Sequence, residues 1–328
     1  MIKVHHLNCG SLCPGNYTVI NQKFSQIQEL TQSAPMQQAA EITKKLFNIA
    51  QNFPFSPFNT VRRKITPYWE KLANELTTFH KSLDLVCHCL LIEDRDQLIL
   101  VDTGLGSIDI KHKTDRLPLE FLFLANPKLD MNETALFQIK NLGFDPKDVR
   151  HIIATHMDVD HIGGVFDFPW AKLHILEPEF QTASNPTTPM GKKRYIKKFW
   201  DKHNSFELYD PQKGEENWNQ FSKIHLINEI SDDIFLVPLP GHSVGHMGIG
   251  IESQKLFFVG DAYLSHEQVQ SEQPRSSKLI QAYNKIIQSD IDLYTQNLNK
   301  IRELYKTGSH KIFCSHDKGE LDLFHNLL

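Results

Sequence analysis

The chain has 328 residues, with 35 Lys and Arg against 39 Asp and Glu. The resulting formal net charge of −4 gives no general attraction to nucleic acid or to an anionic membrane. Hydrophobic residues make up 40% and charged residues 23%, which is typical of a folded globular protein and excludes a disordered or collagenous one. The longest apolar run, residues 121–125, is far shorter than the ~20 residues that cross a bilayer. No signal-peptide pattern is visible, so we expect a cytoplasmic protein without a membrane span.

Residues 22–82 differ in pattern from the rest of the chain. They carry two helical patterns, the first opening at Pro35 and the second at Pro67, each with an apolar stripe at helical spacing. We expect two amphipathic helices that lie on the main body. Between them is a group of aromatic residues interleaved with prolines: Phe53, Phe55 and Phe58. These rings either form an apolar wall or lid for a substrate or only anchor the segment, and both interpretations stay open.

From about residue 85, short β-branched or leucine-rich runs each end in a polar loop, which is typical of strands. The expected strands are 86–93, 97–103, 151–155, 173–177, 234–238, 247–252, 255–259 and 311–314. Helices are expected at 132–142, closed by Gly143, and at 290–305. The chain shows no long linker and no internal repeat. We therefore predict one α/β domain over residues 1–328, with segment 22–82 as a helical insertion packed on it.

The chain has five cysteines, an odd number that lacks the spacing of a zinc ribbon. We expect reduced thiols. Cys87 and Cys89 flank His88 in a predicted strand, where period-two alternation places both thiols on one face and the imidazole on the other. Buried, inert thiols are favoured over metal ligands.

Residues suited to metal binding gather where the predicted strands end. The strand 151–155 stops at four such residues within six positions, and two glycines follow. Imidazole and carboxylate groups both bind zinc, and a strand end can hold them at fixed angles. Three more residues of this kind, His242, Asp261 and His316, each follow another apolar run. The complete set of candidate ligands is His156, Asp158, Asp160, His161, His242, Asp261 and His316. Seven ligands are more than one ion needs, so the sequence predicts a two-metal site.

These motifs resemble those of the metallo-β-lactamase-fold hydrolases and, among them, the N-acyl-homoserine lactonases. The resemblance runs from residues 8–10 through 100–104 to 315–317 and covers nearly the whole chain. It implies a four-layer αβ/βα sandwich, with two mixed sheets face to face, helices outside and a two-metal site along one edge. It further implies one metal on His156, Asp158 and His242, the other on Asp160, His161 and His316, and Asp261 as the bridge.

One position departs from the family's His-x-His-x-Asp-His motif, because Asp158 stands where the second histidine is usual. A further carboxylate makes the first site more anionic and richer in oxygen, so manganese, iron and cobalt compete better with zinc. We expect two divalent ions. Zinc is the expected metal, and manganese, iron and cobalt are its competitors.

Several neighbouring residues have structural interpretations. His246 is expected either to form a hydrogen bond that supports a ligand or to be a core histidine, and not to bind metal itself. Asp102 is expected to form hydrogen bonds that organise a turn, and the basic run 192–198 to be a solvated helix face. Tyr263 has two open interpretations. It either donates to a substrate carbonyl, although it follows Asp261 by two residues where the relatives have three, or it is a packing residue.

Two neighbouring divalent ions lower the pKa of a shared water and polarise a carbonyl, so we predict a bridging hydroxide as nucleophile. Asp160 is the expected proton donor to the leaving oxygen. The predicted function is hydrolysis of a lactone, with an N-acyl-homoserine lactone as the expected substrate and quorum quenching as its consequence. A glyoxalase II-like thioesterase is the alternative, and a phosphodiesterase a weaker one. The expected partner is a small molecule with an acyl chain, not nucleic acid or membrane, and a homodimer is left open.

Overall fold

The computed structural model describes residues 2–13, 84–118, 121–122, 125–214, 216–225, 230–270, 284 and 287–325. The chain divides into two compact units. The first comprises Met1–Ser11, Leu85–Leu117 and Lys128–Leu328, and the second comprises Leu12–Asp84 and Pro118–Pro127. The helices predicted within 22–82 and their three phenylalanines lie outside the described residues. The insertion and its role as a lid therefore stay predictions.

The first sheet has six strands in the order β1-β2-β3-β4-β5-β6. Their bounds are β1 Lys3–Leu12, β2 Leu85–Asp94, β3 Gln97–Val101, β4 Val149–Ile153, β5 Lys172–Leu176 and β6 Phe206–Tyr209. β2 and β3 form an antiparallel hairpin, whereas β3, β4, β5 and β6 run parallel. Parallel neighbours end at the same edge of a sheet. Residues 102 and 155–161 therefore emerge side by side after β3 and β4.

The second sheet has six strands in the order β12-β11-β10-β9-β8-β7. Their bounds are β7 Glu216–Trp218, β8 Phe221–His225, β9 Ile234–Pro238, β10 Met247–Ile251, β11 Leu256–Phe258 and β12 Lys311–Phe313. Neighbours pair antiparallel except β11 and β12, which run parallel with Phe258 opposite Phe313. This parallel pair brings Asp261 and His316 to one edge.

Side chains of the strands alternate between two apolar layers. Leu236 of β9 and Ile99 of β3 belong to one buried apolar layer, which contains residues of both sheets. Phe235, the neighbour of Leu236, points the other way and packs in a second layer that includes Leu298. Gly250 of β10 leaves room for the Phe235 ring, because a Cβ at position 250 would lie 2.1 Å from that ring. Full burial of each such side chain stabilises the fold by roughly 1.5–3 kcal/mol.

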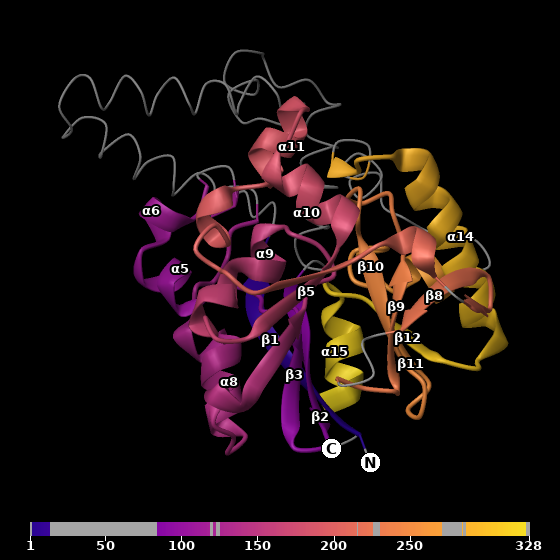
Figure 1. Ribbon diagram of the computed structural model, residues 1–328, viewed down its shortest axis with the longest axis horizontal. Helices are drawn as coiled ribbons and strands as arrows, with labels where there is room; N and C mark the ends of the chain where they lie inside the picture. Colours follow the sequence, from indigo (N-terminus) through magenta and orange to yellow (C-terminus); the bar gives the residue numbers. More distant parts are fainter. Residues whose placement is uncertain are drawn as a thin grey trace, which may run out of the picture. The chain divides into compact units, whose positions relative to one another are not determined.

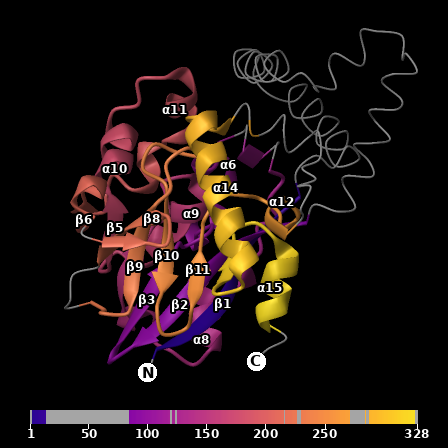
Figure 2. The ribbon, with the colours of Figure 1, turned by 90° about the vertical axis from the view of Figure 1, so that its right-hand side faces the viewer.

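Helices lie outside the sheets. Figure 1 shows α8 (Ala135–Asn141) and α14 (Ile291–Thr307) on opposite sides of them, and the turned view in Figure 2 brings α14 to the front. Asp290 caps α14 by accepting hydrogen bonds from two backbone amides, and Gly308 ends it at a φ of 63°. In the described part of the chain, no helix is both long and apolar enough to span a membrane.

The remaining helical segments are short. The α-helices are α5 Ser107–Lys111, α6 Lys113–Arg116, α9 Val159–Ile162, α10 Glu177–Ser184, α11 Pro189–Arg194, α12 Glu267–Gln270 and α15 Lys318–His325. The 3-10 segments are η1 Met131–Glu133, η2 Pro146–Asp148, η3 Gly163–Asp167, η4 Lys197–Phe199 and η5 Pro211–Lys213.

The predicted fold class is confirmed: two mixed sheets face each other and helices lie outside. Each predicted strand is present, with ends that differ by at most two residues. The helix predicted at 132–142 forms as η1 and α8, and the one predicted at 290–305 as α14. The strands β1, β6, β7 and β8 were not predicted. β1 carries His5, His6 and Asn8 where a typical strand has β-branched residues, and β7 has only three residues.

Candidate metal centre

The predicted ligands follow the C-terminal ends of β4, β9, β11 and β12. Backbone hydrogen bonds between the sheets bring these ends together. The amide of Met247 donates to the carbonyl of Thr155 at 2.9 Å, and the amide of His88 donates to the carbonyl of Ser315 at 2.8 Å. Four loops that are distant in sequence therefore meet at one edge of the two sheets.

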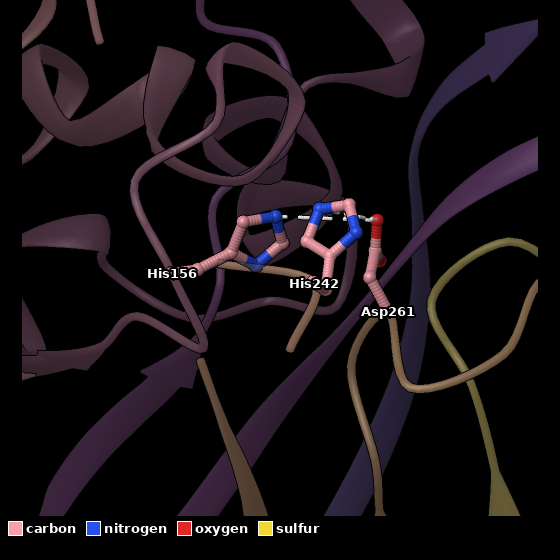
Figure 3. Close-up of side chains that lie close together, drawn as sticks. All are labelled: His156, His242 and Asp261. Atoms are coloured by element: carbon pink, nitrogen blue, oxygen red, sulfur yellow. Dashed lines mark ion pairs between the residues drawn. The ribbon is translucent and has the colours of Figure 1, made fainter. Parts of the chain in front are cut away.

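One set of possible ligands, the first set, consists of His156, His242 and Asp261. Their ligand atoms all lie within 4.8 Å of one another, and all three side chains are buried. Asp261 Oδ2 is 3.5 Å from His242 Nε2 and 3.9 Å from His156 Nε2. Figure 3 shows the two rings and the carboxylate directed toward one another. Asp158 lies beside this set, with Oδ2 at 3.2 Å from His242 Nε2 and 3.4 Å from His156 Nε2.

The second set consists of Asp160, His161 and His316, whose ligand atoms also lie within 4.8 Å of one another. His316 Nε2 is 3.8 Å from Asp160 Oδ2. The carboxylate of Asp261 faces this set as well, with Oδ1 at 3.4 Å from His161 Nε2 and Oδ2 at 3.1 Å from His316 Nε2. Asp261 thus lies between the two sets, as a bridging ligand would.

Each of the four histidines has its Nδ1 engaged by a partner outside the two sets. The pairs are His156 with Thr155 Oγ1 (3.0 Å), His161 with Asp102 Oδ2 (2.8 Å), His242 with Gln288 Oε1 (2.9 Å) and His316 with the carbonyl of Val86 (2.8 Å). Such bonds fix the ring and leave Nε2 for a metal ion. Among the described residues, His156 Nε2, His161 Nε2 and Asp261 Oδ1 are buried without a hydrogen-bond partner. These orphaned inward atoms fit divalent metal ions.

The electrostatics of the cluster agree with this fit. Burial alone would raise the pKa of Asp261, but His316 and His161 outweigh it and lower this pKa well below its ordinary value. Burial opposes a charge on His161, yet Asp261 and Asp102 raise its pKa well above the usual one. The carboxylates therefore attract positive charge strongly, and divalent cations supply it.

Two predicted outer partners are confirmed. Asp102, at a φ of 54°, accepts hydrogen bonds from both the amide and the hydroxyl of Thr155 at 2.8 Å, besides its bond with His161. His246 Nε2 accepts from the amide of Asp261 at 2.9 Å, while its Nδ1 bonds to the carbonyl of Leu239. Asp102 therefore orients the predicted ligand His161, and His246 orients the backbone of Asp261, the predicted bridge.

The prediction that the basic run 192–198 is a solvated face is wrong for Arg194. Its side chain is 5% exposed, and its Nε lies 3.1 Å from Asp158 Oδ1. Lys192 and Lys193 on the same helix are exposed. The signal that could have revealed Arg194 is the extra negative charge of Asp158, which needs a nearby cation when it is buried.

Sequence reasoning also missed Glu179 of α10, which joins two ligand loops. Its buried carboxylate accepts hydrogen bonds from the amide of Met157 (3.0 Å), the hydroxyl of Ser243 (2.7 Å) and the amide of Gly245 (2.9 Å). Residues 241–245 match the Gly-x-Ser-x-Gly pattern of serine hydrolases. Because Ser243 is fully buried and donates to Glu179, its hydroxyl supports the loops and is not placed as a nucleophile.

Tyr263 is fully buried, and its hydroxyl donates to Glu320 Oε1 at 2.8 Å. Glu320 also accepts from the amide of Cys314, and burial raises the pKa of this glutamate to about 8. The ring belongs to the apolar layer that contains Leu298 of α14. These contacts correspond to the packing role that the sequence left open, and not to a hydrogen bond with substrate.

The predicted cysteine environment is confirmed for the strand pair. Cys87 and Cys89 are free and buried, and burial raises the pKa of both thiols well above the usual value. His88 points to the opposite face, where its ring lies 5.1 Å from that of Phe313. These thiols are protonated core residues and not thiolate ligands.

Comparisons with known proteins agree with this fold and site. The model of the metallo-beta-lactamase superfamily matches residues 83–304. A "probable metallo-hydrolase" of Mycobacterium tuberculosis is 33% identical over 237 residues, which are 71% of this chain and 75% of the relative. An N-acyl homoserine lactonase of Bacillus thuringiensis is 23% identical over 254 residues, 74% of this chain and 86% of that one.

A solved N-acyl homoserine lactone hydrolase with bound N-hexanoyl-L-homoserine has a similar fold. Its TM-score is 0.55 at 20% identity, and the match covers 73% of this chain and 84% of that one. The chain belongs to the metallo-beta-lactamase superfamily. Together with the two ligand sets, this membership defines it as a metallo-hydrolase of that superfamily.

Proposed function

We propose that this metallo-hydrolase opens a lactone ring, with N-acyl-homoserine lactones as its substrate class. The observation that carries the proposal is the arrangement of the two ligand sets around Asp261, with four histidine Nε2 atoms turned inward. The similarity to a lactonase at 23% identity and to a lactone hydrolase structure supports the proposal that the bond hydrolysed is a lactone ester.

The proposed ligand assignment keeps the two sets separate. His156, Asp158 and His242 would hold one ion; Asp160, His161 and His316 would hold the other; Asp261 would bind both. Ions bound there would supply Lewis-acid polarisation of the substrate carbonyl and lower the pKa of water at the site. We propose zinc as the metal, with manganese, iron or cobalt as competitors because Asp158 adds an oxygen ligand.

Asp160 is the proposed proton donor to the leaving oxygen. Its side chain is 14% exposed, whereas those of His316 and His161 are 5% and 2% exposed. Within the second set, this carboxylate is therefore the group most open to a bound substrate. A carboxyl group within hydrogen-bond reach of the leaving oxygen can transfer a proton to it as the ring opens.

The proposed partner is a small molecule with an acyl chain, in a cytoplasmic setting. Nucleic acid and membrane surfaces are not proposed as partners, since the net charge of −4 attracts neither. The Phe53, Phe55 and Phe58 group remains the proposed contact for the acyl chain, although it lies outside the described residues.

The test is acid release from a panel of acyl-homoserine lactones and simple lactones. Protein loaded separately with zinc, manganese or iron is compared with the Asp261→Ala variant, and an acyl-thioester is assayed in parallel. We expect lactone turnover that is lost in Asp261→Ala. Turnover of the thioester alone would replace the proposal with a thioesterase. Silence on every substrate with two metals bound would reject the lactonase function.

A further inference from the structure

The two oxygens of Asp158 face different partners. Oδ2 lies 3.2 Å from His242 Nε2 and 3.4 Å from His156 Nε2, on the side of the first set. Oδ1 lies 3.1 Å from the Nε of Arg194. This contact is an ion pair without hydrogen-bond geometry, in which the guanidinium attracts one oxygen by charge and leaves the other oxygen toward the ligand set.

Arg194 is itself fixed by the segments around the first set. One terminal nitrogen donates to the carbonyl of His242 at 2.5 Å and to Ser289 Oγ at 3.1 Å. The other donates to the carbonyl of Ile287 at 2.7 Å. The planar guanidinium can make all of these bonds at once, and a lysine could not. The cation is thus built into the site and does not belong to the solvated lysines of the same run.

The charges of the pair are complementary. Asp158, Asp160 and Asp261 bring three negative charges to the two sets, and Arg194 brings one positive charge next to Asp158. A histidine at position 158 would be neutral when it binds a metal. The pair of Asp158 and Arg194 therefore has the same net charge as that single histidine, but it offers an oxygen ligand in place of a nitrogen.

We infer that Arg194 is a positioning residue of the metal centre: it holds Asp158 with Oδ2 turned to His156 and His242, and this positioning of the ligand oxygen maintains ion affinity at the first set. This inference rests on the metal-binding part of the proposed function and not on the substrate. The inference connects two features: the carboxylate at position 158, where the family motif has a histidine, and Arg194, the one buried cation beside the first set among the described residues.

The test is a double-mutant cycle read by metal binding alone. The parent chain, Arg194→Met, Asp158→His and the double variant are stripped of metal and titrated with zinc, and separately with manganese, against a chromophoric chelator. Lys193→Met, from the exposed part of the same helix, is the matched control. Circular dichroism of each metal-free variant shows whether it is folded, and Arg194→Lys replaces Arg194→Met if the latter is not.

We expect Arg194→Met to weaken the binding of one ion by about 10–100-fold, the usual effect of losing an outer partner of a ligand. In the Asp158→His background the same change should weaken binding by less than about threefold, because a histidine has no second oxygen for Arg194 to hold. Lys193→Met should bind both ions as the parent does.

Two results would overturn the inference. Unchanged or tighter binding in Arg194→Met would show that Asp158 does not need Arg194 to present its ligand oxygen. An equal loss in both backgrounds would show that Arg194 acts on the site through bonds other than its contact with Asp158, such as those to the His242 carbonyl, Ser289 and Ile287. Neither result depends on lactone turnover, so failure of the inference and failure of the proposed substrate remain separate outcomes.

Discussion

Two clusters of buried histidines in this chain have opposite chemistry. In the metal centre, His156, His161, His242 and His316 turn Nε2 toward carboxylates. In the other, which we name the His6 cluster, the rings of His6 and His88 lie among those of Phe313 and Phe324. His6 Nδ1 bonds to His88 Nε2 at 2.8 Å, so the two rings share one hydrogen bond and no carboxylate takes part in it.

The surroundings decide which form of the imidazole is stable. Burial, together with His325 and His5, lowers the pKa of His6 to about 3. Burial acts on His161 as well, but Asp261 and Asp102 outweigh it and raise its pKa. Burial of histidine alone therefore gives a neutral core residue. Facing carboxylates outweigh burial and raise the pKa at His161 and His316, whereas at His156 burial prevails and lowers it.

The largest effect should come from removing the carboxylate between the two sets. Asp261→Ala leaves four inward nitrogens without the group that faces all of them, so bound metal should fall and turnover should drop by about 10³-fold. Metal content by mass spectrometry and lactone hydrolysis measure both. Asp201→Ala, at an exposed position, is the matched control. Retention of two ions by Asp261→Ala would remove this residue from the site.

A smaller loss should follow when the outer partner of one ligand is changed. Asp102→Asn replaces the carboxylate that accepts from His161 Nδ1 at 2.8 Å. The ring then loses the bond that fixes its tautomer, and affinity for one ion should fall by about 10–100-fold. Chelator competition measures this affinity. An unchanged value would mean that Asp102 serves only the turn with Thr155.

A smaller change still is expected at the position that departs from the family motif. Asp158→His should keep lactone turnover within about tenfold and shift metal preference toward zinc, because a nitrogen ligand replaces an oxygen. Competition between zinc and manganese for the metal-free protein gives the preference. If this variant binds neither ion, Asp158 has a role other than that of a ligand.

The smallest effect concerns stability and sharpens the contrast between the two clusters. Unfolded histidine has a pKa of about 6.5, and that of folded His6 is about 3. Between these values the unfolded chain binds more protons, so the free energy of unfolding should decrease as the pH falls below about 6.5. The slope is up to about 1.4 kcal/mol per pH unit for each such group.

Urea denaturation at several pH values would show this dependence. The double variant His6→Phe/His88→Leu should have a flatter profile, while its metal content stays that of the parent. His112→Gln, at an exposed position, should leave the profile unchanged. An identical slope in the parent and the double variant would mean that other groups cause the acid sensitivity.

The parts of the molecule that were predictable are those that local pattern controls. The strand 234–238 alternates between two apolar layers, and its apolar run shows this directly. The seven ligand-type residues stand out because polar groups follow apolar runs at fixed points. β1 and the edge strand β6 escaped prediction because their stability depends on pairing with neighbouring strands, and β1 contains polar residues such as His5 and Asn8.

The supporting residues of the site were less predictable for a related reason. Glu179 stands in the first turn of α10, where an acidic residue has an ordinary explanation in the helix dipole. Its partners Met157 and Gly245 belong to loops distant in sequence. Arg194 stands among exposed lysines, and only the folded chain brings it to Asp158. Local sequence reveals ligands, whereas their outer partners are set by tertiary structure.

The central claim is that one cluster holds two divalent ions that share Asp261. The most direct measurement is a titration of the metal-free chain with zinc, followed by calorimetry and by metal analysis after gel filtration. We expect two ions per chain in the parent and fewer than two in Asp261→Ala, with two retained in His6→Phe/His88→Leu. One ion or none in the parent chain would contradict the central claim.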